Sequence, residues 1–297
     1  MSPRRARGRD PKTIMSLRNA VRLSLPLLAL VCAGPAAGAE VKFGFTPVLG
    51  ASQTRAEFEP LMAYLSDAIG RKVVLSVASD YGSLRTQMES GAVDIGSFSP
   101  FAYVDAARGG GVRIIAQSLI EGSGAYRGLI IVRRDSGIAS LEGLAGKRFA
   151  FVDPKSASGY VYPRAMLLEK GIHADTGFSE VVFAGDHRKV IAAVLGRRVD
   201  GGAIYDGALR LAKEAGEPTD DLVTLASTDP IPHDAIAVRS GLDPALAREI
   251  QAALVSLGST ESGRRIIAAS RKGLTGFAIA ADSLYDPVRR TARAAGM

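Results

Sequence analysis

Short apolar runs and amphipathic segments alternate along the chain from residue 41 onward. Apolar runs that end at glycine, proline or aspartate predict strands, whereas apolar residues three and four positions apart predict helices. In the first half we expect helices over 55–69, 81–90 and 100–107, and strands over 41–45, 72–77, 93–97, 112–118 and 126–133. This alternating order is typical of an α/β fold in which helices cover a mainly parallel sheet.

The same alternation starts again near residue 148. The expected strands are 148–152, 181–184, 199–205, 223–226 and 231–239, and the expected helices lie within 159–171 and at 187–195, 208–215, 244–257, 262–270 and 283–295. No Gly/Ser-rich linker separates the two halves, so we expect strands 126–133 and 231–239 to connect them. We therefore predict two lobes, each a mixed, mainly parallel sheet flanked by helices, with lobe 1 at 40–133 plus 231–297 and lobe 2 at 134–230.

The first 39 residues have the pattern of a secretory signal peptide. Basic residues precede an apolar run at 23–33, and the small residues 37–39 (Ala-Gly-Ala) form an A-x-A cleavage signal. The apolar run has about 11 residues, fewer than the roughly 20 that a membrane span needs. We expect cleavage after Ala39 and export to the periplasm, with translation starting at Met1 or at Met15.

The net charge of +7 belongs to this leader. Residues 1–39 contain seven basic residues and one acidic residue, which leaves a net charge of +1 for residues 40–297. A nearly neutral body argues against nucleic-acid binding. The single cysteine, Cys32, follows a bulky valine, which disfavours lipidation; it also excludes a disulfide framework and a cysteine-based metal site. The three histidines are not at metal-ligand spacing, so we expect neither a metal nor a cofactor.

The strongest chemical signal is the segment 153–160 (DPKSASGY), which follows a predicted buried strand and begins a helix. The hydroxyls of Ser156 and Ser158 and the backbone N–H groups around them can converge on one anion at a helix N-terminus. A serine that only caps the helix explains the same pattern, so both interpretations stay open. The segment has neither the Gly-Lys-Ser/Thr of a phosphate-binding loop nor a dinucleotide glycine motif.

Other polar residues occur where strands are predicted to pass into helices. His187 can donate to the same oxyanion, either as an imidazolium or as a neutral ring. Asp234 can accept a hydrogen bond from a ligand O–H or N–H, or it can cap a turn. Tyr81, Tyr103 and Tyr126 lie near predicted strand–helix edges, where core packing of the ring is the alternative to ligand contact.

The chain shows no pattern that indicates catalysis. Ser156 and Ser158 lack the Gly-x-Ser-x-Gly elbow, and the sequence contains no obvious acidic pair or metal-ligand set. Lys155 is the only nearby candidate for a reactive group. We therefore expect a binding protein and not an enzyme.

Six motifs carry a resemblance to a known family. They are Phe43-Gly44-Phe45-Thr46-Pro47, residues 93–104 (VDIGSFSPFAYV), Tyr126-Arg127-Gly128, Asp153-Pro154-x-Ser156-x-Ser158-Gly159-Tyr160, Gly185-Asp186-His187 and Ile231-Pro232-His233-Asp234. Together they resemble the phosphate/phosphite/phosphonate-binding proteins of ABC importers, over about residues 41–280. The resemblance implies a type II periplasmic-binding-protein fold with two hinge crossovers, a phosphorus oxyanion as ligand and a membrane permease as partner.

The resemblance also implies roles for single residues. Ser156, Ala157 and Ser158 match the family's anion cradle, which Tyr126 and His187 complete. This chain departs from the family at the middle of the cradle, where an alanine stands in place of a frequent threonine and removes one hydroxyl donor.

Further positions match the rest of the family's pocket. Tyr81 and Asp234 look like lining residues, and Tyr205 or Asp206 stands where some members place a group for an aminoalkyl tail. His233 replaces an asparagine that is often found before the aspartate. The alanine at position 157 and the histidine at position 233 leave the expected ligand class unchanged, but they leave open which member of that class binds.

Two other functions fit the same sequence. A ligand-sensing module for a membrane receptor kinase would have the same motifs, and a binder of sulfonate-type anions would have a similar pocket. In each case we expect a monomer that binds a small oxyanion in the cleft between the two lobes.

Overall fold

The structure is a computed structural model that describes residues 40–46, 51–270 and 273–297. The predicted signal peptide, Cys32, both candidate start methionines and Pro47 lie outside the described residues. Within these ranges no helix is long and apolar enough to cross a membrane. The same ranges contain no cluster of His, Cys, Asp and Glu side chains that could hold a metal ion.

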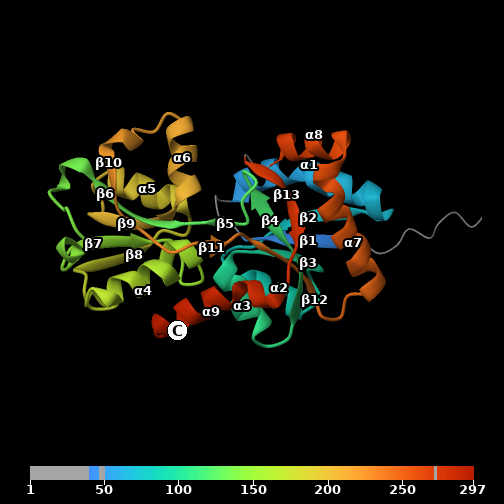
Figure 1. The fold of residues 1–297 in the computed structure, drawn as a ribbon, viewed down its shortest axis with the longest axis horizontal. Coiled ribbons are helices and arrows are strands. Elements are labelled where there is room, and N and C mark those ends of the chain that lie inside the picture. The colour runs from blue at the N-terminus through green and yellow to red at the C-terminus, as the bar shows by residue number, and fades with distance from the viewer. Residues whose placement is uncertain (1–39, 47–50, 271–272) are drawn as a thin grey trace, which may run out of the picture. The chain divides into compact units, whose positions relative to one another are not determined.

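Six strands form the first sheet, in the order β13-β4-β12-β3-β1-β2 (Figure 1). They are β1 (Val41–Phe45), β2 (Val73–Val77), β3 (Ile95–Phe98), β4 (Val112–Ile120), β12 (Ala235–Arg239) and β13 (Leu274–Ile279). β1 is parallel to β2 and β3, whereas β12 is antiparallel to β3 and β4, and β13 is antiparallel to β4. Because β12 and β13 come from the end of the chain, this sheet is discontinuous in sequence.

Helices cover both faces of the first sheet (Figure 1). One face carries α1 (Ala51–Ile69), α7 (Pro244–Ser256) and α8 (Glu261–Ala269), and the other carries α2 (Ser83–Glu89), α3 (Pro100–Ala107) and α9 (Asp286–Ala294). The helical spacing of apolar residues produces this packing, since Leu61 and Leu65 of α1 and Ile250 and Leu254 of α7 are fully buried in one cluster with Phe43 of β1.

Five strands form the second sheet, in the order β10-β6-β9-β7-β8. They are β6 (Gly128–Arg133), β7 (Arg148–Phe151), β8 (Glu180–Phe183), β9 (Gly201–Tyr205) and β10 (Leu222–Ser227). β7 is parallel to β8 and β9, and β6 is antiparallel to β9 and β10. In Figure 1, α5 (His187–Leu195) and α6 (Asp206–Glu214) cover one face and α4 (Tyr162–Glu169) covers the other.

A two-stranded antiparallel ribbon forms where the chain passes from one sheet to the other and back. It consists of β5 (Ala125–Tyr126) and β11 (Ile231–Pro232), with Ile231 opposite Tyr126. β5 follows β4 of the first sheet and precedes β6 of the second, and β11 lies between β10 and β12. The chain therefore crosses between the sheets twice.

Both expected crossover strands are shorter than predicted. The run 126–133 breaks at Arg127, whose backbone N–H donates to the Asp206 carboxylate at 3.0 Å and not to a neighbouring strand. The run 231–239 breaks at His233, whose N–H donates to the Gly124 carbonyl at 2.9 Å. Because β6 belongs to the five-stranded sheet, that sheet begins at Gly128, six residues before the expected boundary.

The α/β fold class is confirmed, and α3 and α5 occupy the predicted ranges. The helix expected over 81–90 is shorter and begins at Ser83. One strand, β13, has no counterpart among the predicted elements. It is an edge strand in which Thr275 and Ile279 are exposed, so its sequence lacks the continuous apolar run of a central strand.

Candidate anion-binding site

A small cavity lies at the carboxyl ends of strands from both sheets. Its lining comes from the residues that follow β2, β3, β7 and β8, from the last residue of β9, and from the crossover ribbon and the residues after it: Tyr81, Ser99, Tyr126, Ser156, Ser158, His187, Tyr205, His233 and Asp234. The carboxyl ends of parallel strands are the usual ligand sites of open α/β sheets. The volume of the cavity is small, about 20 Å³.

The segment after β7 positions two serines at the start of a helix. The Asp153 carboxylate accepts from the Lys155 N–H at 2.7 Å and the Asp153 carbonyl accepts from the Ser156 N–H at 2.9 Å, which turns the chain out of the strand. A π-helical turn, Ala157–Val161, then leads directly into α4. Ser156 Oγ accepts from the Gly159 N–H at 3.0 Å, so this hydroxyl caps the turn as one of the two sequence interpretations expects.

The same helix start presents donors to the cavity. The N–H groups in the first turn of a helix, here those of Ala157 and Ser158, have no intrahelical acceptor. Ser156 keeps its hydroxyl proton available while its oxygen accepts from Gly159. Capping and anion binding are thus compatible at this serine.

Tyr126, in the crossover ribbon, lines the cavity together with Ser158. Burial raises the pKa of Tyr126 well above its ordinary value, the Asp234 carboxylate raises it further, and the Ser158 side chain only partly offsets both. The Tyr126 ring stacks on His233 with ring centroids 4.9 Å apart, which fixes its position in the cavity wall.

Tyr81 brings a buried hydroxyl into the cavity. Its side chain is 2 % exposed, and its hydroxyl has no hydrogen-bond partner among the described residues. Burial, followed by the nearby Asp234 carboxylate, raises the pKa of Tyr81 well above its usual range, so the phenol keeps its proton at neutral pH. A buried donor without a partner is costly, and a bound acceptor would satisfy it.

His187 is the first residue of α5, and its tautomer follows from its partner. The backbone N–H of Tyr205 donates to His187 Nδ1 at 3.2 Å, which requires an unprotonated Nδ1. The ring proton therefore lies on Nε2. The positive end of the helix dipole also favours this neutral form over an imidazolium. Of the two forms that the sequence leaves open, this geometry favours the neutral ring.

Two lining residues, Ser99 and His233, were not among the predicted site residues. Ser99 follows β3 and precedes α3, and its hydroxyl donates to the Lys155 carbonyl at 3.3 Å across from the first sheet to the second. The pattern of strand, serine and helix is the one that drew attention to Ser156, so the signal was present in the sequence. His233 was noted only as a departure from the family.

Three of the predicted site residues do not line the cavity. Ala157 is buried within the π-helical turn, where its backbone and not its side chain is relevant. Asp206 lines a neighbouring groove together with Tyr126, Tyr205 and His233. Tyr103 belongs elsewhere, because its hydroxyl donates to Asp282 at 2.6 Å on the far side of α3. Seven of the ten predicted site residues therefore line the cavity.

Lys155, the candidate for a reactive group, is not in the cavity lining. Its ammonium pairs with Asp105 of α3 at 2.9 Å and lies 5.7 Å from the centroid of the Phe101 ring. A lysine held in an ion pair and protonated is a poor nucleophile.

The cavity is thus rich in neutral donors and has one carboxylate, Asp234. Hydroxyls come from the tyrosines and serines, an N–H comes from His187, and the starts of α3, the π-helical turn, α5 and α6 all lie at the lining residues. No Arg or Lys is among the described residues that line it. Helix N-termini and hydroxyls bind anions without a permanent positive charge, and a lone acceptor suits an anion that retains a proton.

The two sheets, joined by two crossovers, have the fold of type II periplasmic binding proteins. Comparison with a solved structure agrees: the binding-protein component of an ABC phosphonate transporter from Pseudomonas aeruginosa superposes with a TM-score of 0.78, at 23% identity, covering 85% of each chain.

Sequence comparison gives the family. Residues 43–285 match the family described as ABC transporter, phosphonate, periplasmic substrate-binding protein, and the chain belongs to it. The phosphonates-binding periplasmic protein of Escherichia coli is 27% identical over 261 residues, which cover 85% of this chain and 75% of that protein. The phosphate-import protein PhnD of Mycolicibacterium smegmatis is 33% identical over 170 residues, which span 54% of this chain and only about half, 53%, of the relative.

Proposed function

We propose that this protein is the periplasmic solute-binding component of an ABC importer and that it holds a phosphorus oxyanion in the cavity at the start of the π-helical turn. The observation that carries the proposal is the combination of many neutral donors with the single carboxylate Asp234 in one small cavity. The donors would take the charged oxygens, and the carboxylate would accept from a P–OH group.

Several lining groups have a specific role in this proposal. Ser158, the Tyr81 hydroxyl and His187 Nε2 would donate to the charged oxygens, with the N–H groups at the start of the π-helical turn. Because these donors are neutral, the ligand is released when the cavity opens, as transport requires. Asp206, in the neighbouring groove, would interact with a substituent that extends beyond the cavity.

The Asp234 carboxylate would distinguish phosphonates from sulfonates. A monoprotonated phosphonate can donate to Asp234, whereas a sulfonate is fully deprotonated at neutral pH and would be repelled by it. Phosphate, phosphite and small phosphonates are therefore the expected ligands. One sequence relative is named for phosphate import and the other for phosphonate binding, so both kinds of ligand should be tested.

Calorimetry on the exported protein tests the proposal with phosphate, phosphite, methylphosphonate, aminoethylphosphonate and an alkanesulfonate. Ser158→Ala should weaken binding of the preferred ligand by about 1.5–3 kcal/mol, or roughly ten- to a hundredfold, because it removes a bond to a charged oxygen. Ser227→Ala, on an exposed residue at the end of β10, is the control and should leave binding unchanged. Absence of binding to every phosphorus ligand would refute the proposal.

Asp234→Asn separates the ligand classes. The substitution should lower the affinity for monoprotonated methylphosphonate, because only this ligand has a proton to donate. The affinity for an alkanesulfonate should stay the same or rise. Equal losses for both ligands at the same pH would show that Asp234 has a structural role.

We also propose that the protein is not an enzyme, that its two sheet modules behave as hinged lobes, and that it acts as a monomer without nucleic acid. Export through cleavage after Ala39 belongs to the same proposal. N-terminal sequencing of periplasmic material should begin at Glu40, and a sequence beginning at Met1 or Met15 would exclude cleavage at this site.

A further inference from the structure

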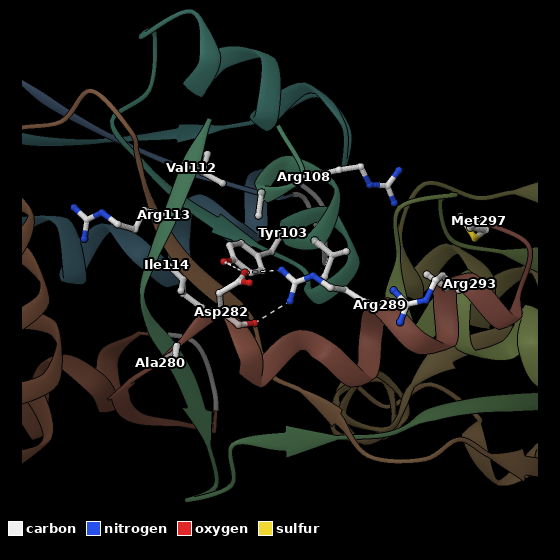
Figure 2. Close-up of a pocket in the computed structure, with 14 residues that line it drawn as sticks. Tyr103, Arg108, Val112, Arg113, Ile114, Ala280, Asp282, Arg289, Arg293 and Met297 are labelled. Carbon is white, nitrogen blue, oxygen red and sulfur yellow. Dashed lines mark hydrogen bonds and ion pairs between the residues drawn. The ribbon is translucent and has the colours of Figure 1, made fainter. Parts of the chain in front are cut away.

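A basic groove lies apart from the anion-binding cavity, between α3, β4 and the C-terminal helix α9 (Figure 2). Its volume is about 580 Å³, far larger than the cavity. Small apolar side chains form part of its lining, among them Val112 and Ile114 of β4, Ala280 and Ala292. Arginines from three different elements surround this apolar part: Arg108, Arg113, Arg289 and Arg293.

The charge of the basic groove is out of proportion to the rest of the protein. Its lining contains four arginines and one acidic residue, Asp282, a balance of +3, whereas residues 40–297 together have a net charge of +1. Arg289 is already engaged, since it pairs with Asp282 and with Asp286, the latter at 2.9 Å. Charge gathered on one face of a nearly neutral body favours an anionic partner on that face.

The other three arginines are available to such a partner. Arg108, Arg113 and Arg293 are exposed, and no ion pair involves any of them within the described parts of the chain. Their heads are spread out in Figure 2, with Arg113 and Arg293 at opposite ends of the basic groove. A site for one small oxyanion would need these heads to converge on a point.

We propose that the basic groove docks an acidic protein surface, one that presents several separated carboxylates beside an apolar side chain. Spaced arginines around a small apolar centre are the composition of a protein interface, in which Arg and Met are enriched. Met297, at the end of the chain, extends the apolar part of the lining. This inference rests on the proposed function, in which the acidic surface belongs to the membrane component of the importer.

α9 connects the basic groove to the anion-binding cavity. Val288 and Ala292 of α9 lie in one hydrophobic cluster with Val161 and Tyr162, which join the π-helical turn to α4. Arg164 of α4 donates to the Ala295 carbonyl at 2.9 Å, just beyond the end of α9. A partner seated in the basic groove therefore contacts a helix that packs against both modules.

Binding of labelled poly-L-glutamate to the exported protein, followed by fluorescence anisotropy, tests this docking surface. The triple variant Arg108→Glu/Arg113→Glu/Arg293→Glu should lose at least roughly tenfold in affinity, because it replaces attraction with repulsion at three positions. The control triple variant Arg71→Glu/Arg198→Glu/Arg248→Glu changes the net charge equally outside the basic groove and should stay within about twofold of wild type. Wild-type binding should weaken as salt is raised.

Four further measurements decide the outcome: the Gln variants, methylphosphonate calorimetry, competition by pyrophosphate and binding to phosphatidylglycerol vesicles. If the charge reversals lower the melting temperature, variants in which the same three arginines are changed to Gln replace them in the binding test. Calorimetry with methylphosphonate on each variant shows separately whether the proposed function holds, because the basic groove and the cavity share no lining residue. Undetectable poly-L-glutamate binding, equal losses in both triple variants, equal competition by pyrophosphate, or binding only to phosphatidylglycerol vesicles would each overturn the proposal.

Discussion

The surroundings of Tyr81 give the most direct indication that a ligand binds here. Its hydroxyl is buried, stays protonated because burial and Asp234 raise its pKa, and finds no partner among the described residues. Ser156, by contrast, already accepts from Gly159, so removing its hydroxyl would disturb the helix start as well as the site. Single-residue tests of binding are therefore cleanest at Tyr81 and His187.

Tyr81→Phe should weaken ligand binding without weakening the fold. The loss should be about 1.5–3 kcal/mol, since one donor to a charged oxygen disappears. The melting temperature of the ligand-free protein should stay constant or rise, because the substitution removes an unsatisfied buried group. Calorimetry and thermal unfolding measure the two effects, and a lower melting temperature together with unchanged affinity would assign the hydroxyl to the fold.

His187 tests the tautomer argument. Because Nδ1 accepts from the Tyr205 N–H, the donor to a ligand is Nε2–H, which the amide of glutamine can replace. His187→Gln should keep affinity within roughly threefold of wild type, whereas His187→Ala should lose tenfold or more.

The pH dependence adds a second readout at His187. Between pH 7 and 8, wild type and His187→Gln should show parallel affinity curves if the donor is the neutral ring, because the ligand's own titration affects both. If an imidazolium were the donor, wild-type affinity would fall with rising pH relative to the glutamine variant.

Among the elements, the π-helical turn depends on close approach to the end of β7. A Cβ added at Gly159 would lie 2.5 Å from Val152 Cβ and 2.8 Å from Ser156 Oγ, so only glycine fits between the helix start and the strand. The segment that donates to the ligand is therefore fixed by packing beneath it.

Gly159→Ala should lower stability and ligand affinity together. Overpacking of this kind costs about 1–3 kcal/mol in the free energy of unfolding. Gly109→Ala is the matched control, because its added Cβ would have Arg85 Nη2 as its nearest neighbour at 3.7 Å, an ordinary contact. Denaturant unfolding and calorimetry on both variants check this, and a stable Gly159→Ala protein with normal affinity would contradict it.

For the whole molecule, the proposed hinge makes contacts between the two modules relevant to ligand binding. Lys155 of the second module pairs with Asp105 of the first at 2.9 Å, and Arg188 donates to Gln53 at 3.2 Å. Neither pair lines the cavity. If the modules are hinged lobes as proposed, these pairs would act on ligand binding through the equilibrium between open and closed arrangements.

Asp105→Asn should weaken ligand binding by roughly two- to fivefold, because a partly exposed ion pair contributes at most about 1 kcal/mol. The matched variant Lys155→Met should give a similar loss, and the double variant should lose little more. Additive losses in calorimetry would show that the two residues act independently.

Acid unfolding gives an independent check on Asp105. Burial raises the pKa of this carboxyl, but Lys155 and Arg85 outweigh that effect and the net pKa is lowered. A lowered folded-state pKa stabilises the protein above about pH 4 and ceases to do so as pH falls through the lowered value. The stability advantage of wild type over Asp105→Asn should therefore be present at pH 7 and disappear on acidification.

Much of the fold and part of the site could be predicted because the relevant signals are local. The helical spacing of α1 and α7, the strand–serine–helix junction at Ser156 and the histidine that starts α5 each depend on a few neighbouring residues. Ser99 was missed although it has the same junction. β13 was missed because this edge strand neither alternates regularly in exposure nor contains a continuous apolar run.

The sequence alone determined the element types, the nearly neutral body and the polar residues at strand ends, because backbone propensity and apolar periodicity act over short stretches of chain. Only the tertiary structure decided which of those ends meet. It brings Tyr81 and Asp234 to one cavity, turns Tyr103 toward Asp282, and seats α9 against both modules. Strand pairing and side-chain packing join residues that are far apart along the chain, and no local pattern encodes which partners they will find.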